Sequence, residues 1–197
     1  MTLTTKQKDD FFNFHIPHRL CLLFAFRERQ SWIKTRIGQK DGDLVRTSKD
    51  AALLSIRLFA NFLGLKMSRS GQIAESFYSK KDWPNDVNVL DLGGEPAKLN
   101  ELAEDKRMTL EELLKRADKE LAHLTASFAD QLKSNNAAII VRGIDIIEDL
   151  LRKQLYDRAK DGLGQKYPFP TLENERTIHG DECEIVGGSP CCKPPWE

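Results

Sequence analysis

Two side chains suited to phosphate chemistry, Arg116 and His123, stand seven positions apart in the sequence. A histidine can take up and release a proton near neutral pH. An arginine holds a permanent charge in a planar fork that matches phosphate oxygens. Together they could cleave RNA without a metal ion: His123 would move protons on the 2′-hydroxyl or the leaving oxygen, and Arg116 would stabilise charge on the phosphoryl group. Lys119 lies between them and could bind the substrate.

The pair needs a helix if the two side chains are to share one face. At about 100° per residue, seven steps return to within roughly 20° of the start. Thr109 to Glu112 has the pattern of a capping box, and an apolar stripe at helical spacing follows: Leu110, Leu113, Leu114, Ala117, Leu121, Leu124, Phe128 and Leu132. Measured from Ala117, both Arg116 and His123 fall roughly 100° to 120° round the helix. They are therefore expected to border the core without entering it.

Two further helices are predicted before this one. The first runs from Pro17 to about Arg36, with the proline at its first position, where a missing N–H costs nothing. Its first half is apolar on almost every side, which predicts a central buried position. The second takes its N-cap from the stretch 47–50 and ends near Gly64, with a core stripe of Leu54, Leu58, Phe59 and Phe62.

A fourth helix follows a polar break at residues 134–136 and stops before Gly162, with a core stripe of Ile140, Ile144, Ile147, Leu151 and Leu155. Between the second and third helices, residues 66–106 form a mixed excursion. A short helical piece is expected near Ile73 to Tyr78, and the alternation over 87–90 favours a short strand. Gly93 and Gly94 predict a turn.

The fold class expected from these elements is all-α, an antiparallel four- to five-helix bundle. Residues 1–164 would form the helical domain, and residues 165–197 an irregular C-terminal tail that contains proline and cysteine. Proline at positions 168, 170, 190, 194 and 195 is incompatible with a continued helix there.

Composition narrows the classes of function. The chain has 30 basic and 30 acidic residues, so no overall positive field draws it to nucleic acid or to an anionic membrane, and any RNA contact must be local. The apolar run Leu20 to Phe26 is far shorter than the ~20 residues of a membrane span. The first ten residues lack the features of a signal peptide, which favours a cytoplasmic location.

Four cysteines, at positions 21, 183, 191 and 192, do not form a disulfide framework. With His179, the last three offer metal ligands, but their spacing matches no paired arrangement known for tetrahedral ions. We therefore expect no metal site and no cofactor.

The segment around Arg116 and His123 resembles the HEPN superfamily, the helical domains named for higher eukaryotes and prokaryotes nucleotide binding. Its signature is an arginine, four to six residues, then a histidine, and the sequence from Asp118 to Thr125 resembles the polar, charged, Ala-His ending common in that group. The resemblance implies a dimeric helical bundle with a composite ribonuclease site, acting in toxin–antitoxin or phage-defence systems. RNA, a second copy and an antitoxin protein would then be the partners. Ala117 departs from the family, which usually has Asn, Asp or His there.

Plainer interpretations stand beside this one. A chain with this many basic residues can show an Arg and a His at such a spacing by chance, on a solvated helix edge. The protein would then be a non-catalytic helical module for dimerisation or protein interaction. Similarly, His15 and His18 around Pro17 could be a second acid–base pair or simple surface residues, and Arg27 could line the same groove as Arg116 or pair along its own helix.

Overall fold

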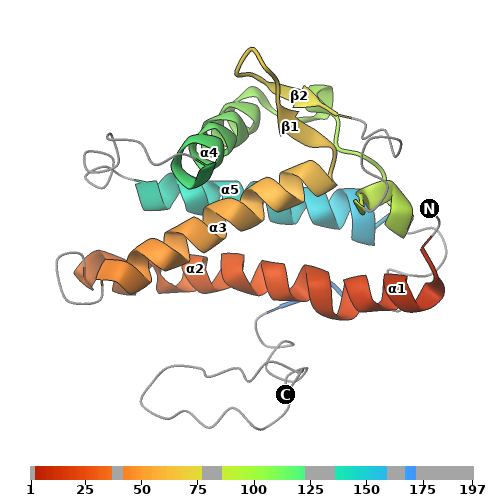
Figure 1. Ribbon diagram of the computed structural model, residues 1–197, viewed down its shortest axis with the longest axis horizontal. Helices are drawn as coiled ribbons and strands as arrows, with labels where there is room; N and C mark the ends of the chain where they lie inside the picture. The colour runs from red at the N-terminus through yellow and green to blue at the C-terminus, as the bar shows by residue number, and fades with distance from the viewer. Residues whose placement is uncertain (1–2, 37–41, 77–85, 123–135, 159–166, 172–197) are drawn as a thin grey trace, which may run out of the picture.

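The computed structural model describes residues 3–36, 42–76, 86–122, 136–158 and 167–171, with side chains for 3–28, 47–76, 86–118, 137–158 and 167–171. The protein is mainly α-helical, with a small two-stranded antiparallel sheet (Figure 1). Helix α3 is central, because it packs on α2, α4 and α5. The all-α fold class expected from the sequence is therefore confirmed.

The N-terminal helical segment begins earlier than predicted. Helix α1 (Thr5–Asp10) opens with a capping box between Thr4 and Gln7, continues through a π-helical turn η1 (Phe11–His15), and passes into α2 (Ile16–Arg36). The prediction that Pro17 is the first helical residue is wrong. The Ile16 N–H reaches back five residues to the Phe11 carbonyl, so the widened turn accommodates a proline that has no N–H to offer.

Helix α3 (Gly42–Phe62) also begins before the predicted N-cap at Thr47. Its predicted core stripe is in part wrong, since Leu54 and Leu58 are 38% and 40% exposed. The buried positions are Ala52, Leu53, Ser55, Ile56, Phe59 and Ala60, followed by Leu63 just after the helix end. Apolar residues occupy both faces of this helix, so periodicity alone cannot decide which face turns inward.

The excursion between α3 and α4 contains the sheet. Strands β1 (Leu65–Met67) and β2 (Ile73–Glu75) pair with Leu65 opposite Glu75, so the helical piece predicted from Ile73 is wrong in its described part. The predicted strand over 87–90 is wrong as well: Asn88 caps a 3₁₀ turn η2 (Val89–Leu92), which ends at Gly93 in the left-handed conformation. A second 3₁₀ turn, η3 (Leu99–Glu101), precedes α4.

Helix α4 (Glu104–Ala122) begins five residues before the capping box predicted at Thr109. Glu104 and Asp105 occupy its first turn, where carboxylates interact favourably with the helix dipole. The Thr109 hydroxyl instead donates to the carbonyl of Asp105, at 2.8 Å, from inside the helix. The capping-box prediction is therefore wrong.

Helix α5 (Asn136–Leu151) runs on into a second π-helical turn, η6 (Arg152–Tyr156). Its predicted stripe of Ile140, Ile144, Ile147, Leu151 and Leu155 is fully buried. Gly143 of α5 faces Leu113 of α4 so closely that a Cβ atom at 143 would lie 2.2 Å from the leucine Cδ1. The absence of a side chain at 143 thus lets α4 and α5 approach each other.

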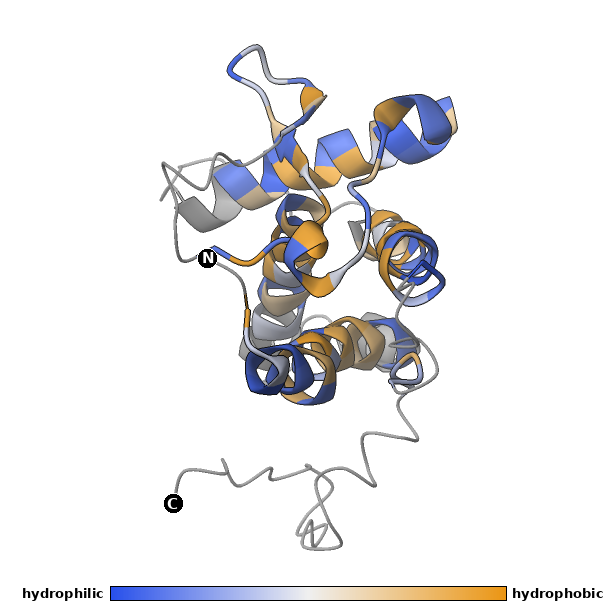
Figure 2. Cartoon of the chain, turned by 90° about the vertical axis from the view of Figure 1, so that its right-hand side faces the viewer, coloured by the Kyte–Doolittle hydropathy of each residue, from blue (hydrophilic) through white to orange (hydrophobic). Residues whose placement is uncertain are grey.

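Apolar faces of the helices and of the sheet turn toward one another, and polar faces turn outward (Figure 2). They form one hydrophobic core, which also receives Tyr167 and part of Phe169 from the C-terminal segment. Among the described residues, no helix is long and apolar enough to span a membrane. Residues 167–171 contain neither helix nor strand, and the rest of the predicted tail lies outside the described residues.

Candidate functional site

Arg116 lies on α4 at the edge of the core, as the sequence predicts. Its side chain is 25% exposed, while the neighbouring Ala117 is 1% exposed and packs in the core. The guanidinium of Arg116 forms an ion pair with Glu112, one turn earlier on the same helix. The candidate catalytic cation is therefore held beside a carboxylate in the free protein.

The other two predicted site residues are placed less fully. Lys119 belongs to α4, but its side chain is outside the described residues, and His123 follows the last described residue of α4. The geometry between Arg116 and His123 therefore remains an expectation from the helical spacing. An α-helix that continued for one residue past Ala122 would bring His123 to the face of Arg116.

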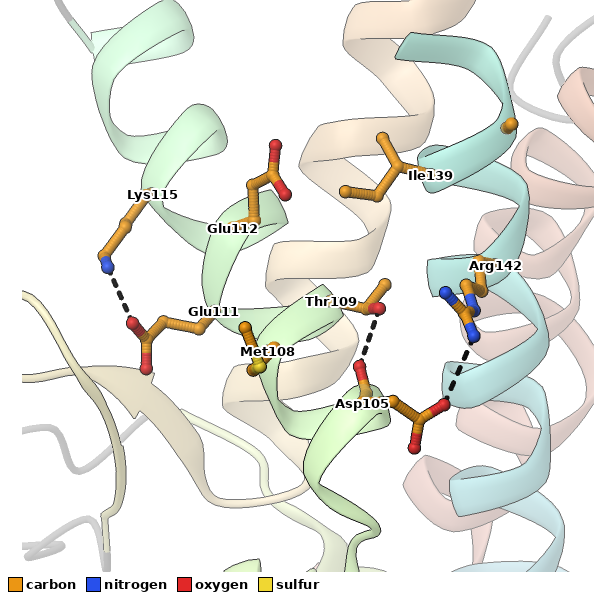
Figure 3. Close-up of a pocket in the computed structure, with 9 residues that line it drawn as sticks. Asp105, Met108, Thr109, Glu111, Glu112, Lys115, Ile139 and Arg142 are labelled. Atoms are coloured by element: carbon orange, nitrogen blue, oxygen red, sulfur yellow. Dashed lines mark hydrogen bonds and ion pairs between the residues drawn. The ribbon is translucent and has the colours of Figure 1, made fainter. Parts of the chain in front are cut away.

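A groove of about 670 Å³ lies between α4 and α5 (Figure 3). Asp105, Thr109 and Glu112 line it from α4, and at steps of four, three and four residues they lead to Arg116. Helix α5 contributes Ala138, Ile139 and Arg142. In Figure 3 the Glu112 carboxylate and the Ile139 side chain extend into the space between the two helices. By helical spacing, the face of α4 that lines the groove continues to Arg116.

The charged groups that line this groove are mostly paired with one another. Arg142 of α5 reaches Asp105 of α4 at 3.2 Å, and Lys115 contacts Glu111 at 2.6 Å. Three carboxylates, those of Asp105, Glu111 and Glu112, face two cations. The groove is therefore slightly acidic without Arg116 and close to neutral with it, and it offers a polyanion little attraction away from Arg116 itself.

Asp118 lies on α4 at the edge of the core stripe opposite to Arg116. Its carboxylate forms an ion pair with Arg57 of α3 at 3.0 Å. Arg27 of α2 is not among the residues that line this groove. It pairs with Asp145 and Glu148 of α5, at 3.2 and 2.9 Å, so the interpretation that it lines the same groove is wrong. These contacts connect neighbouring helices at the rim of the core.

Glu111 connects the groove to the β1–β2 hairpin, because its carboxylate also accepts the Ile73 backbone N–H at 3.3 Å. The hydrogen bond from Lys115, and then that from Ile73, holds the pKa of Glu111 below its ordinary value of 4.5. A depressed pKa means that this contribution to stability is present at neutral pH and is lost as pH falls through the folded pKa.

We therefore expect the Ile73 amide resonance to titrate with a midpoint below 4.5, the ordinary value for glutamate. The reason is that protonation of Glu111 weakens the hydrogen bond it accepts. A proton–nitrogen NMR titration measures this, and Glu111→Gln should remove the step. A midpoint at or above 4.5, or a step that survives the substitution, would show that Glu111 does not hold the hairpin.

Within the part of the chain that the structure describes, no group of three or more histidine, cysteine, aspartate or glutamate side chains could hold a metal ion. His179, Cys183, Cys191 and Cys192 lie outside that part. His15 is exposed and packs against the Phe11 ring at 4.8 Å, which agrees with a surface role.

Comparisons with protein families, curated proteins and solved structures found no match. The candidate site therefore depends on the residues themselves. Sequence reasoning placed Arg116 at the core margin but did not find its partner, Glu112, which it had assigned to a cap. The i,i+4 spacing of the two opposite charges was the available signal. The groove could not be found in the sequence, because α5 supplies one of its walls.

Proposed function

We propose that this protein is a metal-independent endoribonuclease of HEPN type, which acts through Arg116 and His123 and works as a dimer in a toxin or defence role. The observation that carries the proposal is the position of Arg116, at the edge of the core and in line with the residues along the α4–α5 groove. A side chain there is anchored by its neighbours while its charged end can reach a ligand. The Arg–His spacing adds an acid–base group on the same face.

The proposed reaction is transesterification within the RNA chain. His123 accepts the proton of a 2′-hydroxyl, whose oxygen bonds to the adjacent phosphorus as the bond to the 5′-oxygen breaks. The leaving oxygen takes up a proton, and the products are a 2′,3′-cyclic phosphate and a 5′-hydroxyl end. Arg116 stabilises the charge on the equatorial phosphoryl oxygens. In a dimer, two such pairs would face one substrate.

The Glu112 ion pair sets a condition on this mechanism. A phosphate that binds Arg116 must take the place of the Glu112 carboxylate or share the guanidinium with it. Since the groove lining adds no net positive charge, affinity for RNA must come from Arg116, Lys119 and surfaces away from the groove.

Substitution of His123 by alanine is expected to reduce RNA cleavage by about 100-fold or more, because general acid–base catalysis contributes ~10² to 10⁴. The measurement is the rate at which purified protein cleaves a labelled RNA in the presence of EDTA. Thermal unfolding should be nearly unchanged, since His123 falls outside the apolar stripe. If the variant cleaves RNA at the wild-type rate, His123 has no catalytic role. If the wild type loses its activity in EDTA, the reaction requires a metal ion.

A second candidate function is a non-catalytic dimerisation module, and one observation favours it. Leu54 and Leu58, one turn apart on α3, leave a considerable part of their apolar surface exposed on the side away from the core. Arg57, between them in the sequence, forms an ion pair with Asp118 of α4. Light scattering would measure the oligomeric state of the wild type and of Leu58→Glu. If the protein cleaves no RNA, and the wild type is a dimer while Leu58→Glu is a monomer, the dimerisation function replaces the ribonuclease function.

A further inference from the structure

The C-terminal strap, residues 167–171, reads Tyr-Pro-Phe-Pro-Thr and lies against Phe12 and Tyr156, whose rings also contact each other at 5.6 Å. Tyr167 is only 4% exposed, Pro170 is buried and Phe169 is half-buried. The strap contacts both π-helical turns, η1 near the start of the described chain and η6 at the end of α5. A segment outside any helix or strand is thus held in place by its side chains.

The receiving surface consists of Asp9, Phe12, Arg152 and Tyr156. The Tyr167 ring stacks on Phe12 with centroids 4.7 Å apart and planes within 5°, and its hydroxyl donates to Asp9. The Phe169 ring meets Tyr156 edge to face at 5.0 Å. Arg152 places its guanidinium 3.6 Å from the centre of the Phe169 ring. Each aromatic side chain of the strap therefore has its own partner on the surface.

The strap sequence is suited to recognition. Proline fixes its own φ near −65°, and it disfavours the helical conformation for the residue before it. Two prolines, each preceded by an aromatic residue, keep the segment extended before it docks, so little conformational entropy is lost on binding. Extended proline-containing peptides that dock on aromatic side chains are a recurring mode of protein recognition.

We propose that the receiving surface is a peptide-recognition site, that its ligand is an extended partner segment in which aromatic residues alternate with proline, and that the strap occupies it as a built-in competitor. The aromatic and charged contacts described above are made by side chains, so a partner segment of the same chemistry can form them in place of the strap. The strap, being tethered, acts at a high effective concentration and keeps the site closed to weak ligands.

The test uses the full-length chain with the strap side chains removed, Tyr167→Ala/Phe169→Ala. The probe is a fluorescent peptide with the sequence of residues 166–171, and its anisotropy is the readout. We expect saturable binding to this variant and at least tenfold weaker binding to the wild type, whose own strap competes. A peptide with alanine in place of both aromatic residues should not bind.

A second pair of variants examines the receiving surface. In the strap variant, Arg152→Gln should weaken peptide binding by about two- to tenfold, through loss of the cation–π contact. Lys153→Gln is the matched control, because Lys153 is adjacent on η6 but pairs with Glu101 at 2.8 Å. It should leave peptide binding unchanged.

Several results would overturn the proposal. One is a folded strap variant that binds no peptide. Another is equal affinity of the peptide for the variant and for the wild type. A third is binding of the alanine peptide to the variant as tightly as the aromatic peptide. If the variant alone is unfolded, excess peptide must restore a cooperative unfolding transition, because a ligand of the folded state stabilises it. If excess peptide does not restore that transition, the proposal is also overturned. A wild-type dimer that disappears in the strap variant would show that the strap is exchanged between copies instead.

Discussion

Replacement of Gly143 by valine should lower the free energy of unfolding by about 3 kcal/mol or more, enough to unfold a marginally stable domain. A Cβ at 143 would lie 2.2 Å from Leu113 Cδ1 and 3.4 Å from Ile56 Cδ1. Leu113 is completely buried, so its side chain cannot move out into solvent without a shift of the helices. Helices α4 and α5 would have to separate, and the core between them would loosen.

The matched control is Ala138→Val, which adds a β-branched side chain to an exposed position of the same helix. It should change stability by less than about 1 kcal/mol, the size of a helix-propensity effect. Denaturant unfolding followed by circular dichroism measures both variants. Equal stability of the two would mean that α4 and α5 do not approach closely at Gly143, and the groove described above would lose its geometry.

Helix α5 shows where the sequence was sufficient. Most of its large apolar residues lie on one broad face, and all five positions predicted for the core are buried. In such a helix the periodicity has a single solution, because only one face can be removed from water. The same holds for Arg116, whose place at the core margin follows from the buried Ala117 beside it.

Helix α3 shows where the sequence was not sufficient. Leucines 54 and 58 form a stripe as regular as the one that is buried, and only contacts with α2, α4 and α5 decide between them. Packing against distant segments is not visible in local spacing. The exposed pair that results is the observation behind the dimerisation alternative.

Helix starts were the least predictable feature. Thr109 has the residues of a capping box, yet the chain is already helical five residues earlier, at Glu104. A threonine inside a helix can satisfy its hydroxyl on the carbonyl of the preceding turn, as Thr109 does with Asp105. The same residue type is therefore compatible with both positions. Thr4 and Gln7 do form a capping box, at a helix start that the sequence pattern did not indicate.

Arg116→Lys is expected to reduce the rate of RNA cleavage by about 100-fold or more, although the positive charge is retained. A lysine ammonium is a single point charge and cannot bind two phosphoryl oxygens with a planar fork. Loss of one such electrostatic donor typically costs ~10² to 10³ in rate. Stability should change little, since the Glu112 pair is partly exposed and a surface ion pair contributes ~0 to 1 kcal/mol.

Glu112→Gln is the matched variant, on the same helix and at the other end of the same ion pair. Loss of the carboxylate removes the Glu112 partner of the Arg116 guanidinium and a negative charge from the groove. RNA binding should become tighter, with cleavage equal to or faster than that of the wild type. A catalytic carboxylate at 112 would produce the opposite change.

The single-turnover rate of RNA cleavage in EDTA, compared between these two variants, tests the central claim most directly. We expect Glu112→Gln to cleave at least as fast as the wild type and Arg116→Lys to cleave at least about 100-fold more slowly, with cyclic phosphate ends on the product. Equal rates for Arg116→Lys and the wild type, or no cleavage by any of the three proteins, would contradict the proposed Arg–His ribonuclease.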